Sequence, residues 1–238
     1  MSADILVFAA HPDDAELACG GTIAGLVAKG KKVVIVDLTQ GEMGTRGTPE
    51  SRKAEALAST GILGLADRWQ LNLPDTTFGN SREEQHLLIQ ALRYFRPSVV
   101  LANAVSDRHP DHARAAKLAE DACFYSGLPK IETSYAGKMQ EAWRPNLVLH
   151  YIQSDWIQPD LVVDISAVWE TKLKAIKSFK TQFHNPDSLE PETFISTPRF
   201  LKFLESRARE FGHQIHVEMG EGFTCRRPIG VSDLLMIF

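Results

Sequence analysis

Short apolar runs alternate with longer amphipathic stretches along the first half of the chain, and this alternation constrains the fold more than any other feature. Residues 4–10 (DILVFAA), 32–39 (KVVIVDLT) and 98–104 (SVVLANA) have the composition of buried strands, and residues 15–29 and 82–95 have helical periodicity. Such alternation favours βαβ units with right-handed crossovers. The sequence therefore predicts an α/β fold: a Rossmann-like, mostly parallel sheet with helices on both faces.

Further elements fit the same pattern. A helix is expected from Pro49 to Ser59, with Thr48 as its N-cap and the proline in the first turn, where it is tolerated. A weaker strand is expected over 68–74 and a helix over 111–124.

The second half is less regular, but no linker or low-complexity tract separates it from the first. Strands are expected over 146–153 and 161–166, and helices over 167–179 and 198–211. We therefore expect one domain over 1–238, in which 1–125 form the core that carries the site. The remainder, 126–238, is expected to be a smaller C-terminal extension that completes the fold and the substrate pocket.

Composition excludes several classes of partner. The net charge is −4, and Lys and Arg form no run, which argues against nucleic acid. No window approaches 18 apolar residues and the N-terminus does not resemble a signal peptide, so we expect a cytoplasmic protein without a membrane partner. The three cysteines are far apart in sequence and are expected to be structural thiols.

Two polar clusters follow predicted strands. HPDDAE (11–16) follows the first strand and DRHPDH (107–112) follows the strand at 98–104. Ligands of open α/β sheets bind beyond the carboxyl ends of the strands, so both clusters should lie at one edge. Each cluster alone fits a turn with a helix cap. Together they predict a metal site of two histidines and one carboxylate with a position left open, which is typical of catalytic zinc.

The segments AAHPDDAELACGGTIA and DRHPDH resemble the PIG-L/LmbE-like family of metal-dependent N-deacetylases. TQGEMGTRGTPESRKAEA, LNLPD, KSFKTQF and GEGF are similar to its bacillithiol-biosynthesis branch, the N-acetylglucosaminyl-malate deacetylases. The resemblance implies a zinc-dependent hydrolase that removes the N-acetyl group from N-acetylglucosaminyl-L-malate. The alternative within the family is another N-acetylglucosamine conjugate or a thiol conjugate.

The resemblance also implies roles for individual residues. His11, Asp14 and His112 would bind the metal, Asp13 would be the general base, and a protonated His109 would stabilise the oxyanion and protonate the leaving amine. Amide hydrolysis needs a nucleophile at neutral pH, which zinc supplies by lowering the pKa of water. Iron(II) would fit the same ligands.

Candidate substrate-binding residues lie on or just after loops at the same edge: Glu42, Arg52 and Asp75. Arg52 is the candidate for the malate carboxylates, because its planar guanidinium suits bidentate recognition. The alternative for Arg52 is a solvent-facing ion pair with Glu50 or Glu55.

Two further acidic residues have open roles. Asp111 would either orient a histidine from the second coordination shell or cap the following helix. Glu16 would either hydrogen-bond in the site or complement the helix dipole. The resemblance further implies a homo-oligomer, with a hexamer as one form.

The rival classes fit less well. A nucleotide-binding Rossmann protein is disfavoured because the G-x-G-x-x-G fingerprint is absent. A non-haem iron oxygenase has similar ligands, but its usual β-barrel conflicts with the alternation of strands and helices. His213 and His216 are expected in a C-terminal strand, where residues three apart face opposite sides, so no second metal is expected.

Overall fold

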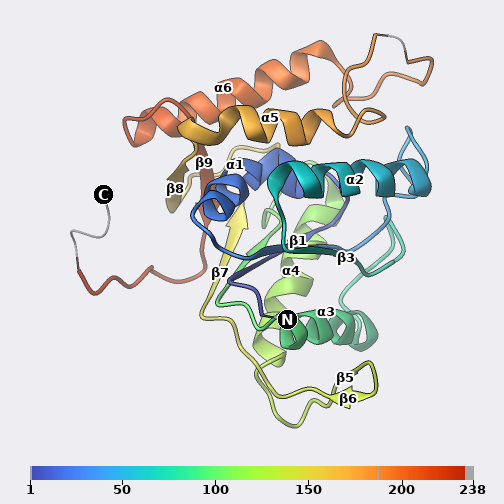
Figure 1. Cartoon of the computed structure of the whole chain (residues 1–238), viewed down its shortest axis with the longest axis vertical. Coiled ribbons are helices and arrows are strands. Elements are labelled where there is room, and N and C mark those ends of the chain that lie inside the picture. The colour runs from blue at the N-terminus through green and yellow to red at the C-terminus, as the bar shows by residue number, and fades with distance from the viewer. Residues whose placement is uncertain (1, 187, 234–238) are drawn as a thin grey trace.

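The computed structural model describes residues 2–186 and 188–233, and its centre is a seven-stranded sheet of order β3-β2-β1-β4-β7-β9-β8 (Figure 1). The strands are β1 (Ile5–Ala9), β2 (Val33–Asp37), β3 (Asp67–Gln70), β4 (Val99–Ala102), β7 (Leu147–Tyr151), β8 (Leu161–Asp164) and β9 (Gly220–Thr224). Strands β3, β2, β1, β4 and β7 are parallel, whereas β9 is antiparallel to both of its neighbours. The predicted mostly parallel α/β fold is confirmed.

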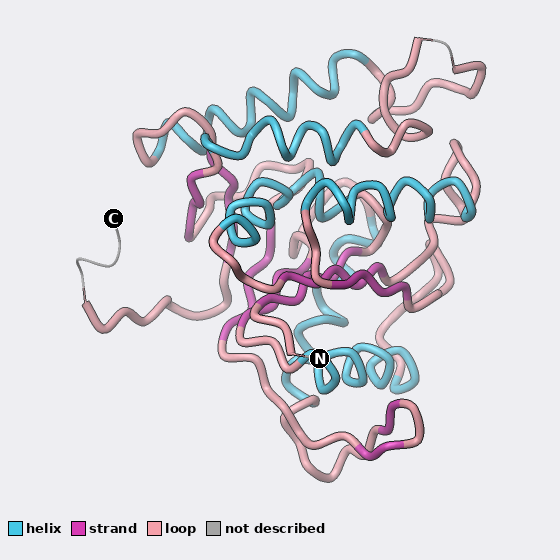
Figure 2. Tube along the Cα trace, in the orientation of Figure 1, coloured by secondary structure: helices cyan, strands magenta, loops and turns pink. Residues whose placement is uncertain are grey.

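Helices cover both faces of the sheet (Figures 1 and 2). They are α1 (Asp14–Ala28), α2 (Pro49–Leu63), α3 (Arg82–Phe95), α4 (Pro110–Tyr125), the 3₁₀ helix η1 (Ser166–Val168), α5 (Trp169–Lys177) and α6 (Pro198–Gln214). Helices α1, α2 and α5 pack together on one face, α3 and α4 lie on the other, and α6 packs on β8 and β9. No helix of the described residues is long and apolar enough to span a membrane.

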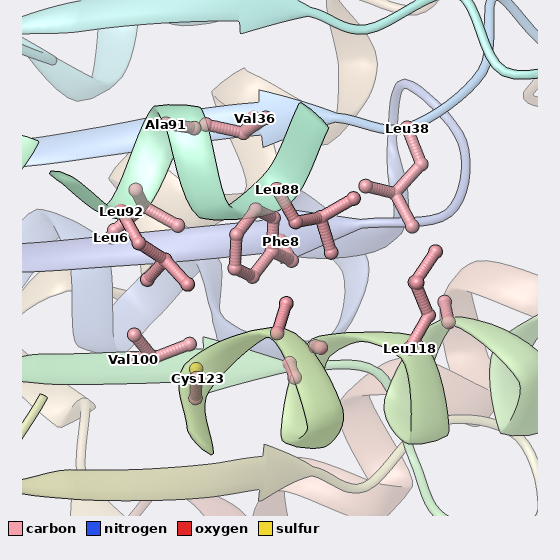
Figure 3. Close-up of a cluster of buried hydrophobic side chains, with 14 of the residues drawn as sticks. Leu6, Phe8, Val36, Leu38, Leu88, Ala91, Leu92, Val100, Leu118 and Cys123 are labelled. Carbon is pink, nitrogen blue, oxygen red and sulfur yellow. The ribbon is translucent and has the colours of Figure 1, made fainter. Parts of the chain in front are cut away.

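The alternation of side chains along β1 divides the core between the two faces. Leu6 and Phe8 pack in a cluster with α3 and α4 (Figure 3), while Val7 and Ala9 pack in a second cluster with α1. Because both faces are covered, all five residues of β1 are buried. This buried strand leads directly into the first polar cluster.

The sequence did not predict β9, nor a small hairpin of β5 (Ser134–Tyr135) and β6 (Lys138–Met139). Strand β9 is glycine-rich, which strand propensity disfavours. A Cβ on Gly222 would lie 2.8 Å from the ring of Phe211, so packing requires glycine there.

Two expectations were wrong in detail. The expected strand at 68–74 stops at Gln70, and Asn72 has a positive φ of 56° that ends the extended conformation. His213 and His216 do not lie in a strand: His213 is in the last turn of α6, and His216 follows the helix with φ 61°.

Candidate metal centre and active site

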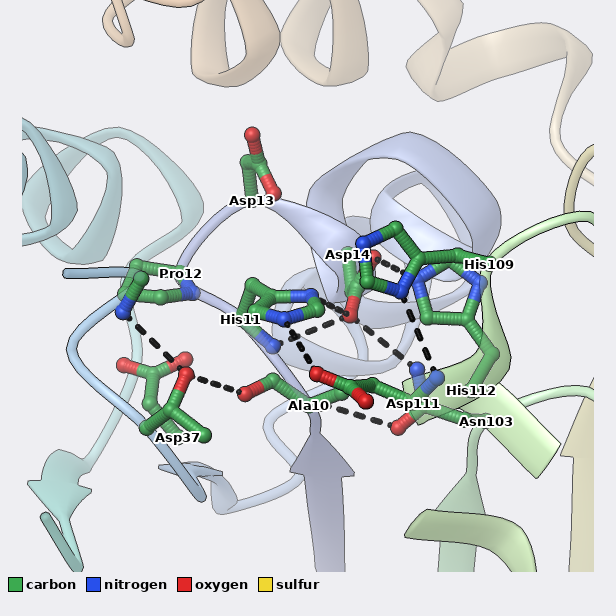
Figure 4. A network of polar contacts seen from close by, with 12 residues as sticks. Ala10, His11, Pro12, Asp13, Asp14, Asp37, Asn103, His109, Asp111 and His112 are labelled. Atoms are coloured by element: carbon green, nitrogen blue, oxygen red, sulfur yellow. Dashed lines mark hydrogen bonds and ion pairs between the residues drawn. The ribbon is translucent and has the colours of Figure 1, made fainter. Parts of the chain in front are cut away.

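The two polar clusters predicted from the sequence meet at one edge of the sheet (Figure 4). His11 lies in the loop after β1, and Asp14 is the first residue of α1. His109 is the N-cap of α4 and His112 lies in its first turn. The ring of His11 is 4.8 Å from that of His109 and 5.9 Å from that of His112, centroid to centroid. Residues from two separate βα loops therefore form one cluster.

Asp14 lies between the two histidines of the expected ligand set. Its Oδ2 is 3.5 Å from Nδ1 of His11, and its Oδ1 is 3.1 Å from Nε2 of His112. All three side chains are buried. One nitrogen of each imidazole thus faces the same carboxylate, as three ligands converging on one cation require.

The opposite nitrogen of each imidazole faces another carboxylate. Nε2 of His11 lies 3.0 Å from Oδ1 of Asp75 and 3.3 Å from Oδ2 of Asp111. Nδ1 of His112 lies 2.6 Å from Oδ2 of Asp107. Histidines that bind metal usually donate their other ring N–H to such a partner, which fixes the tautomer and the ring orientation. The donor set therefore fits a divalent cation.

Two groups of three residues also have donor atoms within 4.8 Å of one another: His11, His109 and His112, and His11, Asp75 and Asp111. Three histidines form a known zinc ligand set. On geometry alone, His109 therefore competes with Asp14 for the third ligand position.

The charges in the cluster favour a cation. Burial raises the pKa of Asp14, but the charge of His112 outweighs it and holds that pKa well below the ordinary value. Burial lowers the pKa of His112, yet Asp14 raises it to about 9. Burial also lowers the pKa of His11, but its hydrogen bond to Asp111 helps to raise it well above the ordinary value. Carboxylates that hold both imidazoles in the cationic form would equally stabilise a metal ion.

Asp13 points away from His11 and Asp14 (Figure 4) and lines the adjacent cavity. Its φ of 129° is a strained conformation for a residue other than glycine, and such strain is concentrated at functional sites. Burial raises the pKa of Asp13 to about 7, although the guanidinium of Arg52, 3.3 Å away, lowers it. A carboxylate with a pKa near neutrality is suited to accept and return a proton.

Arg52 is buried, so the alternative of a solvent-facing ion pair with Glu50 or Glu55 was wrong. Its guanidinium donates to the carbonyl oxygens of Pro12 at 2.5 Å and Gly41 at 3.4 Å. A Cβ on Gly41 would lie 2.1 Å from the guanidinium, which explains the glycine there. Nε of Arg52 has no hydrogen-bond partner among the described residues, and the side chain lines the cavity.

His109 faces the cavity beside the other two histidines. Its Nδ1 accepts a hydrogen bond from the backbone N–H of Asp111 at 3.3 Å, so His109 is the N-cap and the capping alternative for Asp111 was wrong. Burial and the nearby His11 and His112 lower the pKa of His109. The surroundings therefore favour the neutral imidazole over the protonated form that the resemblance implies.

Asp75 lines the cavity, but both of its carboxylate oxygens already have partners. Oδ1 faces His11, and Oδ2 accepts from the backbone N–H of Met43 at 3.0 Å. Burial raises the pKa of Asp75, but the hydrogen bond from His11 and other interactions lower it to about 2. Glu42 accepts from the backbone N–H of Asp75 at 2.8 Å, is exposed, and lies outside the residues that line the cavity.

The undecided role of Glu16 is structural. Its Oε1 accepts hydrogen bonds at 2.6 Å from both Ser59 and Arg68, and Arg68 also pairs with Asp37 at 2.6 Å. Glu16 is fully buried and does not line the cavity. These hydrogen bonds connect the first turn of α1 to α2 and β3.

A cavity of about 340 Å³ opens above the cluster. Much of its apolar wall comes from the C-terminal half, mainly α6 and the segment before it: Ile152, Phe194, Ile195, Phe200, Phe203, Leu204, Ala208 and Phe211. These residues could not be predicted from the sequence, because amphipathic periodicity indicates a buried face without indicating what it covers.

Three polar residues around the proposed ligands were also not predicted from the sequence. Asp107 could have been found, since it belongs to DRHPDH and precedes His112 by about one helical turn. Asn103 and Gln153 donate to Asp14 at 3.1 and 3.0 Å. They follow β4 and β7 and belong to no motif, so no sequence signal identified them.

Known proteins of similar sequence and structure identify the family of this chain. The model of the PIG-L family, described as GlcNAc-PI de-N-acetylase, matches residues 6–123. The diacetylchitobiose deacetylase of Thermococcus kodakarensis is 33% identical over 195 residues, which cover 75% of this chain and 70% of that protein.

Solved structures extend the similarity over nearly the whole chain. The conserved protein TT1542 from Thermus thermophilus superposes with a TM-score of 0.86 at 35% identity, covering 98% of both chains. The N,N'-diacetylchitobiose deacetylase from Pyrococcus horikoshii superposes with a TM-score of 0.78 at 30% identity, covering 93% of this chain and 83% of that one. The chain therefore belongs to the PIG-L family, and it is a deacetylase.

Proposed function

We propose that this deacetylase is a zinc-dependent hydrolase that removes the acetyl group from an N-acetylglucosaminyl conjugate, with N-acetylglucosaminyl-L-malate of bacillithiol biosynthesis as its substrate. One observation carries the proposal: buried histidines and Asp14 converge beside a cavity. Asp13 projects into this cavity, and it has a strained backbone and a pKa near neutral pH. The family relatives named as deacetylases of diacetylchitobiose support the acetylated amino-sugar class.

In this proposal His11, Asp14 and His112 hold the metal. When bound, zinc polarises the acetyl carbonyl and makes water acidic enough to act as a nucleophile near neutral pH. Asp75 and Asp111 would hold the ring of His11, and Asp107 that of His112, through the outer nitrogens. Iron(II) suits the same donors.

Asp13 would take the proton from the attacking water, and its pKa of about 7 suits it to do so. His109, on the opposite side of the ligands, would stabilise the developing oxyanion and protonate the departing amine. Because its surroundings lower its pKa, His109 would take up a proton from solvent before it donates one to the amine, and Asp13 would return the proton of the attacking water to solvent.

Substrate contacts are proposed for Arg52 and Asp75, which line the cavity, whereas Glu42 would act by holding the backbone N–H of Asp75. Arg52 lines the cavity beside Asp13, and its guanidinium would bind a malate carboxylate there. Arg108 is a second cation at the cavity: its guanidinium stacks 4.2 Å from the ring centroid of Phe194. Two cations would suit the two carboxylates of malate.

A deacetylation assay tests the proposal directly. Acetate release would be measured from N-acetylglucosaminyl malate, N-acetylglucosamine and diacetylchitobiose, with added zinc and with chelator. We expect zinc-dependent release with the malate conjugate preferred. Equal rates on all three would reject malate, and release that survives complete removal of metal would reject zinc dependence.

We also propose a cytoplasmic location, which the sequence pattern predicts, and a homo-oligomer with a hexamer as one form, which the resemblance implies. Sedimentation of the purified chain tests the assembly: a monomer at micromolar concentration would reject it.

A further inference from the structure

We propose that Gln153 is a positioning residue of the metal site, whose side-chain amide fixes the carboxylate of Asp14. The inference rests on the proposed metal-dependent function and extends it to the C-terminal half of the chain. Gln153 follows β7 and lines the cavity. It lies outside residues 6–123, which match the family model.

The orientation of the Gln153 amide follows from its neighbours. The backbone N–H of Ala104 donates to Oε1 of Gln153 at 3.1 Å. Because a backbone N–H can only donate, the amide oxygen has to lie on that side. The NH₂ group therefore lies on the other side, where Nε2 is 3.0 Å from Oδ1 of Asp14 and 3.3 Å from Nε2 of His112.

Asn103 is fixed in the same way and complements Gln153. Its Oδ1 accepts from the backbone N–H of Ala10 at 2.9 Å, so its Nδ2 faces Asp14 Oδ2 at 3.1 Å and Gln153 Oε1 at 3.1 Å. Asn103 is fully buried. The two amides thus hold one oxygen each of the Asp14 carboxylate and are bonded to one another, so the carboxylate keeps one oxygen toward each histidine.

Helix α6 holds Gln153 in turn. Arg207 donates to the carbonyl oxygens of Gln153 at 2.5 Å and Ser154 at 2.7 Å, and its guanidinium lies 4.9 Å from the ring centroid of Phe203. Arg207 therefore connects the apolar wall of the cavity to a proposed metal ligand through one residue. A substitution of Arg207 should therefore weaken metal binding indirectly, and by less than a substitution of Gln153.

Gln153→Met tests the role, because methionine has a similar length but no amide. Zinc affinity would be measured by competition with a chromogenic chelator, and folding by circular dichroism. We expect the folded variant to bind zinc roughly 10- to 100-fold more weakly than the wild type, as with other groups that orient metal ligands. At saturating zinc, KM should stay within about twofold while kcat falls, since the substrate contacts persist. The matched control, Gln85→Met on α3, should leave zinc affinity unchanged, because the side-chain amide of Gln85 donates to Asn80, far from the site.

Zinc affinity within about twofold of the wild type in folded Gln153→Met would overturn the role. Asn103→Leu and the double variant add a second test. Because both amides act on one carboxylate, the fold-loss of zinc affinity in the double variant should be smaller than the product of the two single fold-losses.

If Gln153→Met does not fold, Arg207→Met should still weaken zinc binding several-fold, and unchanged zinc affinity in Arg207→Met would overturn the proposal. A wild type that binds zinc but releases no acetate would reject the proposed reaction and leave this test intact.

Discussion

The two halves of the molecule contribute different things to the site. Residues 1–125 supply every proposed metal ligand, the proposed base Asp13 and His109, all close to the carboxyl ends of β1 and β4. Residues 126–238 supply much of the apolar cavity wall and Gln153, which supports Asp14 from β7. The reactive groups are thus set by short loops of a parallel sheet, whereas the cavity is set by how α6 packs over it.

This difference predicts two classes of variant. Substitutions in the first half should abolish metal binding or chemistry and affect all substrates alike. Substitutions in the wall should change substrate affinity and leave metal content intact.

The largest effect is expected from Asp13→Asn, which removes the base and keeps the shape. Turnover should fall roughly 10²- to 10⁴-fold, the usual contribution of a general base. Zinc content, measured by atomic absorption, should match the wild type because Asp13 points away from the ligands. Normal turnover would show that another group accepts the proton.

Arg52→Ala should combine the effects of both classes of variant, because Arg52 lines the cavity and also pairs with Asp13. We expect kcat/KM to fall for every substrate, because the partner of Asp13 is lost. The fall should be roughly 10- to 100-fold larger for the malate conjugate than for N-acetylglucosamine, as for the loss of a charged hydrogen bond. Equal falls would mean that Arg52 acts only through Asp13.

The strain at Asp13 can be measured by comparing Asp13→Gly with Asp13→Ala. Both variants lose the carboxylate, but only glycine adopts a φ of 129° without strain. In urea unfolding, the glycine variant should be more stable by about 1–3 kcal/mol. The usual order, in which alanine is the more stable, would contradict a strained backbone.

The smallest effect is expected in the wall. Phe203→Ala on α6 should raise KM by roughly three- to tenfold, because about 1 kcal/mol of apolar contact is lost. Zinc content and kcat should remain close to the wild type. A loss of zinc comparable to that of a ligand variant would mean that the wall and the metal site are not separable.

The sequence predicted that the two polar clusters lie together, because the determinants of their meeting are local. A buried strand followed by His-Pro-Asp-Asp and a second strand followed by Asp-Arg-His-Pro-Asp-His bring these motifs to one edge once the strands are parallel neighbours. The contact of Gln153 with Asp14 could not be predicted in the same way, because neither this contact nor the position of Gln153 beyond β7 follows from any periodicity or motif.

Packing decided the remaining differences. The alternative of a solvent-facing ion pair for Arg52 was wrong because a long side chain can turn inward, and here it reaches the carbonyl oxygen of Pro12. Strand β9 was missed because its glycines, required by close packing against Phe211, weaken the strand signal. Glu16 was left open between a hydrogen bond in the site and the helix dipole, and its side chain pairs with Arg68, away from the cavity.

The central claim is that His11, Asp14 and His112 hold the metal while His109 acts on the substrate. Zinc bound per chain, measured on purified Asp14→Ala and His109→Ala with activity assayed in parallel, tests it most directly. We predict that Asp14→Ala loses its zinc, and that His109→Ala keeps zinc while turnover falls by at least about 10²-fold. Zinc retained by Asp14→Ala and lost by His109→Ala would contradict the claim and identify the three histidines as the ligands.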